Sequence, residues 1–216
     1  MAQLFDRNAN ILAKTSVIIV ALVVGALGYL IYALNTSSAI TDVAIAKKQP
    51  VPFSHRHHVG ELGIDCRYCH TSVEVSNFAG IPPTATCMSC HSQIWTNAQL
   101  LEPVRQSYQN NVPLQWTRIN ALPDFVYFNH SIHINKGVGC TTCHGPVGEM
   151  PLMYRENTLQ MGWCLSCHRE PEKFVRPREE VFNAFYKPPA NQLELGAKLV
   201  KEYKIQRFTN CSTCHR

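Results

Sequence analysis

Cys66-Arg67-Tyr68-Cys69-His70 is the first of five copies of the pattern Cys-x-x-Cys-His in this chain of 216 residues. Two thiols at this spacing can form thioether bonds to the two vinyl groups of one haem, and the next residue can ligate its iron. The pattern predicts five covalently bound haems c. The attachment residues are Cys66, Cys69, Cys87, Cys90, Cys140, Cys143, Cys164, Cys167, Cys211 and Cys214, and the proximal ligands are His70, His91, His144, His168 and His215.

Two other uses of Cys-x-x-Cys explain the sequence less well. A zinc module pairs its Cys-x-x-Cys elements across a short loop and does not need a histidine after each one. A disulfide framework joins distant segments, whereas two cysteines this close have the spacing of a redox dithiol. The five copies use all ten cysteines of the chain. This regularity favours haem attachment over both alternatives.

The five histidines outside the motifs lie in two short segments that match each other. Phe53-Ser54-His55-Arg56-His57-His58 precedes the first motif, and Phe128-Asn129-His130-Ser131-Ile132-His133 precedes the third. Both contain Phe-x-His-x-x-His, and each is followed by two haem motifs. The repetition indicates a duplicated two-haem unit, residues 51–91 and 126–168, with a fifth haem site at 205–216.

This arrangement resembles the small multihaem cytochromes of the class III type. In that type the first histidine usually ligates the haem bound just downstream, and the second reaches a neighbouring haem. The resemblance implies that His55 and His130 are distal ligands of the haems at Cys66 and Cys140. It also implies that His58 and His133 serve neighbouring haems.

One iron is left without an assigned distal ligand. The candidates are His57, Met150 and Met161, because imidazole nitrogen and thioether sulfur both ligate haem iron. His57 can instead be a solvated neighbour of a true ligand, and the methionines can pack around porphyrin edges. Since the available ligands can occupy both axial positions of all five irons, we expect six-coordinate haems that transfer electrons. We expect no catalytic residue in this chain.

Residues 15–34 form an uncharged apolar stretch, TSVIIVALVVGALGYLIYAL. As a helix it spans roughly 30 Å, enough for the hydrocarbon core of a bilayer. A cleaved signal peptide is the alternative, with Ser37-Ser38-Ala39 or Ala44-Ile45-Ala46 near its cleavage site. The stretch is longer than a typical signal-peptide core of roughly 7–15 residues, which favours a retained transmembrane anchor.

The haem motifs predict the topology more clearly than the flanking charges. Arg7 and Lys14 precede the anchor and Lys47 and Lys48 follow it, so the positive-inside rule is not decisive. Covalent haem attachment takes place outside the cytoplasm in bacteria. We therefore expect a single-pass protein of the bacterial inner membrane with a periplasmic haem domain. The expected parts are a cytoplasmic tail (1–14), the anchor (15–34), a linker (35–50) and the pentahaem domain (51–216).

Composition predicts a sparse multihaem cytochrome c fold of short helices and loops around five haems. Charged residues make up 16% of the chain, and there are 13 prolines. We expect short helices after several motifs and a longer one from about Asn191 to Lys204, with Leu195 and Leu199 on one face. Residues 171–189 are expected to form a linker on the surface. Their basic residues between Lys173 and Arg178 would be solvated or would pair with haem propionates.

The formal net charge of +5 does not identify a partner. Five haems carry ten propionates, and full ionisation would bring the sum to about −5, so the sign of the surface does not follow from the sequence. No nucleic-acid partner is expected.

Three stretches resemble the pentahaem cytochrome c subunits of alternative complex III, a quinol-oxidising respiratory complex. They are residues 123–147, from Pro123-Asp124-Phe125 to Gly145-Pro146-Val147, residues 161–169, Met161-Gly162-Trp163 through Arg169, and Ile81-Pro82-Pro83-Thr84. The resemblance implies a relay of electrons towards a cytochrome c or a terminal oxidase. It implies as partners polytopic quinone-binding membrane subunits, a peripheral iron–sulfur subunit and a monohaem cytochrome c, in addition to membrane lipid.

Two other functions are compatible with the motifs. An autonomous membrane-anchored quinol dehydrogenase would oxidise quinol with this chain alone. A catalytic multihaem reductase would need a vacant distal position on one iron, and the number of available ligands argues against it.

Overall fold

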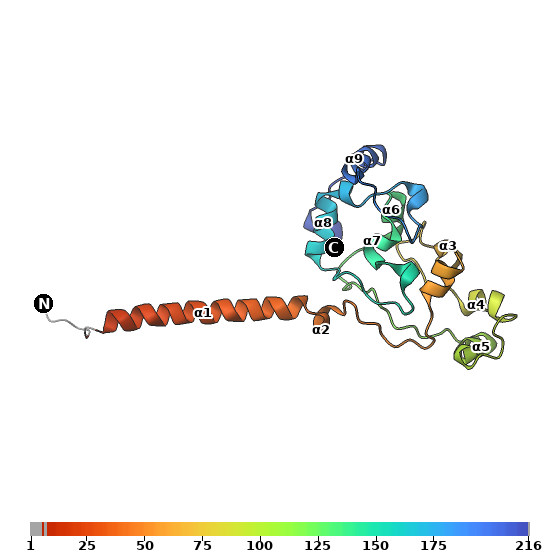
Figure 1. The fold of residues 1–216 in the computed structure, drawn as a ribbon, viewed down its shortest axis with the longest axis horizontal. Helices are drawn as coiled ribbons and strands as arrows, with labels where there is room; N and C mark the ends of the chain where they lie inside the picture. The colour runs from red at the N-terminus through yellow and green to blue at the C-terminus, as the bar shows by residue number, and fades with distance from the viewer. Residues whose placement is uncertain (1–5, 7, 216) are drawn as a thin grey trace. The chain divides into compact units, whose positions relative to one another are not determined.

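A computed structural model describes residue 6 and residues 8–215 (Figure 1). The chain divides into two compact units, Met1–Val43 and Ala44–Arg216. The described residues are helical or irregular apart from isolated bridges, which include Val126 with His215 and Val138 with Val175. The expectation of short helices and loops is therefore confirmed for the described part of the chain.

The first unit contains a long apolar helix. Helix α1 (Ala9–Thr36) includes the whole predicted span 15–34, and none of its residues is buried. By length and composition it can cross a membrane. It is followed by the short helix α2 (Ser38–Thr41), which ends at Asp42 in a left-handed conformation. Arg7 and most of the tail before it lie outside the described residues.

Each haem motif of the second unit lies on a helix. The five helices are α3 (Cys66–Cys69), α4 (Thr84–His91), α7 (Cys140–His144), α8 (Met161–Arg169) and α10 (Cys211–Cys214). Short helices follow several motifs, as predicted, and the motifs themselves also lie on helices, which was not predicted from the sequence. One helical turn places residues i and i+3 on the same face, so the two thiols of each motif lie side by side.

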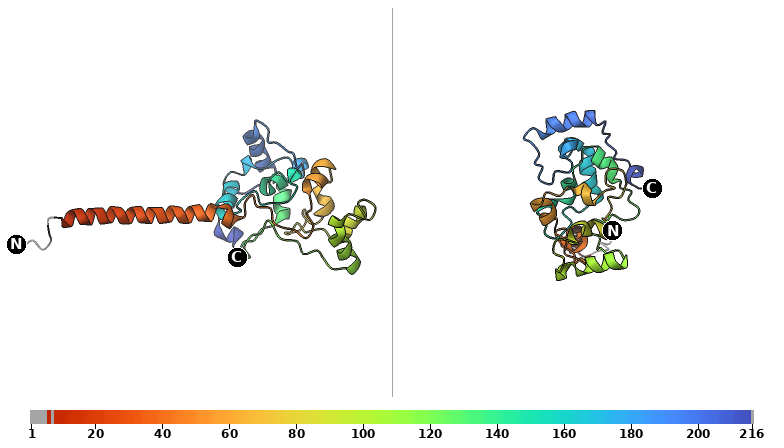
Figure 2. Two further views of the ribbon diagram at one scale, coloured as in Figure 1. Left: turned by 60° about the horizontal axis from the view of Figure 1, so that its bottom comes forward. Right: turned by 90° about the vertical axis from the view of Figure 1, so that its right-hand side faces the viewer.

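The remaining elements are short. The histidine segments contain η1 (Arg56–Glu61) and α6 (His130–Asn135). After the second motif come η2 (Gln99–Leu101) and α5 (Glu102–Asn110), and α5 packs beside α4 in both views of the ribbon (Figure 2). Three single turns complete the unit: η3 (Val147–Glu149), η4 (Pro171–Lys173) and η5 (Arg178–Glu180).

The protein core consists of three small clusters instead of one continuous interior. Their centres are Val51 with Leu101 and Val104, Val73 with Ile134 and Val181, and Val175 with Leu199 and Tyr203. Each cluster ties one segment to another that is distant in sequence. The fold thus relies on local patches of apolar contact that fix the positions of the motif helices.

Helix α9 (Gln192–Glu202) forms where the sequence predicts it. Leu195, Leu199 and Tyr203 share the face that packs in the third cluster. Asn191 occupies the N-cap position, but its side chain makes no capping hydrogen bond.

The prediction of a surface linker at 171–189 was wrong. Val175, Arg176 and Val181 are buried, at 2%, 5% and 1% exposure. The segment is held because the backbone of Arg176 bonds to Gly137, and the carbonyl of Val181 accepts a hydrogen bond from the backbone N–H of Cys140.

Gly196 allows α9 to pack directly on η4. A Cβ atom at this position would lie 1.9 Å from the carbonyl oxygen of Glu172, which is backbone and cannot turn away. We predict that Gly196→Ala destabilises the domain by about 1–3 kcal/mol, because the helix must shift. Lys198→Ala, at an exposed position of the same helix, is the control. A thermal unfolding midpoint of Gly196→Ala equal to that of Lys198→Ala would contradict this packing.

Candidate haem-ligand site

The two histidine segments adopt the same local geometry. The Phe53 ring stacks on His58 at 4.3 Å and meets His55 edge-on at 4.9 Å. The Phe128 ring stacks on His133 at 4.5 Å and meets His130 edge-on at 4.8 Å. In each segment the phenylalanine therefore fixes both imidazole planes, which gives the Phe-x-His-x-x-His pattern a physical basis.

Three pairs of imidazole rings have the separation that one iron between them requires. A ligating nitrogen lies about 2 Å from its metal, so the centres of two rings on opposite sides are roughly 6 Å apart. The observed separations are 6.3 Å for His58 and His91, 6.4 Å for His130 and His144, and 6.1 Å for His133 and His168. His55 lies within electrostatic range of His70, and also of His58 and His144.

The Nδ1 atom of most ligand histidines is held by the backbone. Nδ1–H can donate to the carbonyl at distances of 2.7–3.2 Å, and the pairs are His58 with Ser54, His70 with Gly80, His91 with Ile94, His130 with Asn77, His133 with Asn129 and His215 with Phe125. Such bonds fix the tautomer in which Nε2 is free to ligate a metal. The residues present thus fit bis-imidazole haem ligation.

Burial keeps several of these rings neutral. It lowers the pKa of His55 to about 4, with His70 adding a smaller effect. Burial also lowers the pKa of His144 to about 4, assisted by His130, and lowers the pKa of His133. A neutral imidazole keeps the lone pair that iron needs. Nδ1 of His55 is buried without a partner among the described residues.

Each histidine segment docks on a loop of the other two-haem unit. The backbone and Nδ1 of His130 both bond to the carbonyl of Asn77, in the loop after the first motif. Reciprocally, the backbone N–H of Arg56 bonds to the carbonyl of Met150, in the loop after the third motif. The two halves are therefore interlocked at the first and third motifs.

Neighbouring side chains give the spatial order of the motifs, numbered 1 to 5 along the chain. Motif 2 lies beside motif 1, since Tyr68 and Ser89 share a hydrogen bond of 2.8 Å. Motif 1 lies beside motif 3, because the thiols of Cys66 and Cys140 interact. Electrostatic interactions join Cys143 to motif 4 and Cys164 to Cys214 of motif 5. The order is 2–1–3–4–5.

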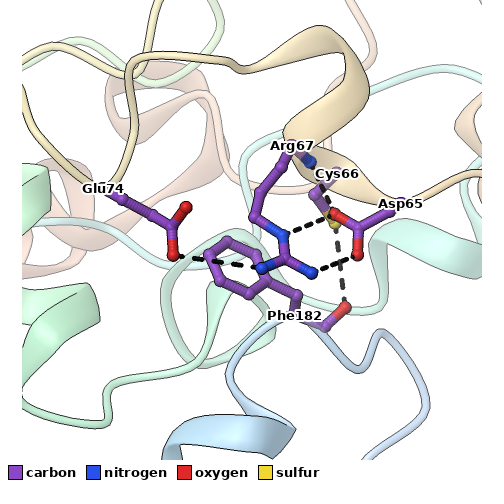
Figure 3. A network of polar contacts seen from close by, with 5 residues as sticks. All are labelled: Asp65, Cys66, Arg67, Glu74 and Phe182. Atoms are coloured by element: carbon purple, nitrogen blue, oxygen red, sulfur yellow. Dashed lines mark hydrogen bonds and ion pairs between the residues drawn. The ribbon is translucent and has the colours of Figure 1, made fainter.

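A polar network holds the first motif, which lies between motifs 2 and 3 in this order (Figure 3). Arg67 bonds to both carboxylate oxygens of Asp65, which also caps helix α3, and lies 4.5 Å above the Phe182 ring. Glu74 approaches the same guanidinium at 4.0 Å. The Cys66 thiol lies 3.8 Å from the carbonyl oxygen of Phe182, so the segment 171–189 is tied to this motif.

The three candidates for the fifth distal ligand lie in different environments. His57 bonds through Nδ1 to Glu61 at 2.8 Å, and its ring stacks over Trp95. Met150 is 1% exposed and so is surrounded by protein atoms. Met161, the first residue of α8, is 65% exposed and lies one turn before Cys164, the neighbour of motif 5.

Sequence reasoning missed the residues that hold the ligands. Asn77 and Asn129 act through backbone carbonyls, which any residue could provide, so no sequence signal identifies them. Asn120 lies against His144, with its side-chain amide 2.9 Å from Nδ1. Its Oδ1 is buried without a partner among the described residues, and a half-turn of the amide would let Oδ1 accept Nδ1–H.

Comparisons with known proteins agree with this site. Residues 126–216 match the family model described as cytochrome c7 and related cytochrome c, so this part of the chain is similar to that family. The chain is also homologous to the "Menaquinone reductase, multiheme cytochrome c subunit" of Nitratidesulfovibrio vulgaris. The two are 29% identical over 143 residues, which are 56% of this chain and 68% of the relative. Both similarities are to cytochromes c, a class of protein that binds haem c covalently.

We predict that Asn120→Asp lowers the reduction potential of one haem, the one that His144 ligates. A carboxylate that accepts Nδ1–H makes the imidazole a stronger donor and stabilises ferric iron. A potentiometric titration monitored by visible absorption and EPR measures the five midpoints. Gln115→Glu makes the same chemical change at an exposed position and serves as the control. Equal titration curves for the two variants would exclude this role for Asn120.

Proposed function

We propose that this chain is the membrane-anchored, pentahaem electron relay of a quinone-linked oxidoreductase complex. The carrying observation is the set of imidazole pairs at 6.1–6.4 Å, each built from a Cys-x-x-Cys-His histidine and an upstream histidine. A haem iron with an imidazole on each side can transfer electrons and has no free position for a substrate. Bound haem c would supply a reversible one-electron iron couple.

The chain's own residues would bind and orient the cofactors. The ten motif cysteines would form the thioether bonds, and the five motif histidines would be the proximal ligands. His55 would be the distal ligand of the first haem, His58 of the second, His130 of the third and His133 of the fourth. The carbonyls at Nδ1 hold each imidazole in one tautomer, which limits movement when the iron changes its charge.

Met161 is our choice as the distal ligand of the fifth haem. Its side chain is mostly not covered by protein atoms and is therefore accessible to a haem. Its helix also contains Cys164, which lies next to Cys214. Met150 is enclosed by protein, which is typical of packing. His57 is committed to Glu61 and lies beside His58, which pairs with the histidine of motif 2 at the other end of the order.

The ligand types support a direction along the relay. Methionine–histidine ligation raises the reduction potential of a haem relative to bis-histidine ligation. With Met161 at motif 5, the highest potential lies at that end, so electrons enter near motif 2 and leave near motif 5.

The partners follow from the resemblance and from the relative. We propose that quinone is bound by polytopic membrane subunits beside α1, together with a peripheral iron–sulfur subunit and a monohaem cytochrome c. The haem unit would lie on the periplasmic side of the inner membrane. The acceptor would be a cytochrome c or a terminal oxidase, as in complexes of the alternative complex III type.

The opposite overall direction is the second candidate function. The relative from Nitratidesulfovibrio vulgaris is a subunit of a menaquinone reductase, which supports a complex that delivers electrons to quinone. The same relay could serve either process, because each haem passes electrons both ways and the partners set the net flow.

Haem reduction by a menaquinol analogue tests the relay. We expect rapid, inhibitor-sensitive reduction in the detergent-solubilised complex and no rapid reduction of the isolated chain, because the quinol site belongs to a partner. Rapid reduction of the isolated chain would instead identify an autonomous quinol dehydrogenase. If the menaquinol analogue reduces the haems neither in the complex nor in the isolated chain, rapid electron transfer from the reduced haems to a menaquinone analogue would support the menaquinone reductase.

Substitution of Met161 tests the fifth ligand. We predict that Met161→Leu abolishes the near-infrared absorption band of a methionine-ligated ferric haem and produces one high-spin EPR signal. Met150→Leu, the matched control, should retain the wild-type spectra. Loss of the band in Met150→Leu but not in Met161→Leu would overturn the assignment.

A further inference from the structure

Arg176 is buried directly behind motif 3, on the segment expected to be a surface linker. The residue is 5% exposed, and its Nη2 donates hydrogen bonds to the hydroxyls of Thr141 at 3.0 Å and Thr142 at 3.2 Å. These threonines are the two residues between Cys140 and Cys143. The guanidinium also lies 4.4 Å from the centre of the Tyr186 ring.

No acidic partner neutralises this guanidinium within the described part of the chain. None of the described ion pairs includes Arg176. The pocket beside it, lined by Lys173 and Gln192 among others, contains no carboxylate. Glu180 acts on Arg176 only at longer range, and its carboxylate accepts a hydrogen bond from Asn183 at 2.7 Å.

The backbone is shaped to hold the side chain there. A Cβ atom on Gly139 would lie 2.2 Å from Cζ of Arg176, so any other residue would displace the guanidinium. Gly137, at φ +80°, lies close to the backbone of the same residue, because its Cβ would be 2.6 Å from the carbonyl oxygen of Arg176. A buried charge without a counter-ion costs several kcal/mol. A surface position would avoid this cost, so the placement points to an electrostatic role.

The position argues against one partner, a propionate of the haem at motif 3. Haem propionates extend from the edge of the porphyrin opposite the vinyl groups. Arg176 lies on the side of the cysteines, which the vinyl groups meet. Its charge therefore acts on the haem of motif 3 without pairing with the propionates of that haem.

We propose that Arg176 raises the reduction potential of the haem attached at Cys140 and Cys143. This proposal rests on the assignment of a haem to motif 3. Reduction adds one electron to ferric iron and lowers the charge of the haem by one. A fixed positive charge in a medium of low dielectric constant favours that reduced form. Motif 3 is the middle of the order 2–1–3–4–5, so Arg176 lowers the energy of the electron at the centre of the relay.

Charge-removing and charge-keeping substitutions in the intact complex test this role. We expect Arg176→Gln to shift one of the five midpoints to lower potential, in an EPR-monitored redox titration, and to leave the other four in place. Arg176→Lys keeps the charge and should shift that midpoint much less. Unchanged midpoints in Arg176→Gln, at full haem content, would overturn the proposal. Equal shifts in both variants would also overturn it, because charge would then not be the cause.

A second pair of variants should shift the same midpoint potential in the opposite direction and leaves the buried side chain of Arg176 unchanged. Glu180→Gln removes the acidic group that acts on Arg176, so the same midpoint should move to higher potential. Glu179→Gln, at an exposed neighbouring position, is the control. If Arg176→Gln does not assemble, the absence of a shift in Glu180→Gln overturns the proposal. These midpoints do not depend on quinol, so a failure of quinol-dependent reduction is distinguishable from a failure here.

Discussion

The structure depends on one constraint: an imidazole that ligates iron must present Nε2 at a fixed place while its other nitrogen is held. Backbone carbonyls meet this requirement at six histidines, and two phenylalanines fix the ring planes of three of these and of His55. These carbonyls come from loops and from the starts of short helices. Irregular structure is thus useful in this fold, because it lets carbonyl groups point at the imidazoles.

The duplicated unit explains how the motifs form a line. Each histidine segment stays close to its own motif in sequence but is anchored on the loop of the other half, through Asn77 and Met150. This exchange brings motifs 1 and 3 together and directs motifs 2 and 4 outwards. Motif 5 then extends the line beyond motif 4.

The sequence predicts local chemistry better than spatial arrangement. Five Cys-x-x-Cys-His copies and the paired Phe-x-His-x-x-His segments indicate the ligand types, because covalent attachment fixes residue spacing. The apolar face of α9 is likewise visible in the spacing of Leu195, Leu199 and Tyr203. The burial of side chains within residues 171–189 is not visible in the sequence, since prolines and charges in that segment suggest a surface loop. The order of motifs rests on contacts such as Tyr68 with Ser89 that leave no periodic pattern.

The interlocking of the two halves has a consequence for biogenesis. The loop that contains Asn77 can bond to its partner only after the chain has been synthesised as far as residue 130, and Arg56 can bond to Met150 only after residue 150 has been added. With three small apolar clusters as the protein core, the N-terminal half has little to hold it before then. In the proposed topology, haem attachment at the first two motifs would therefore begin before stable tertiary structure forms, and the thiols would have to stay reduced during export. Haem delivery would then compete with oxidation of the ten cysteines.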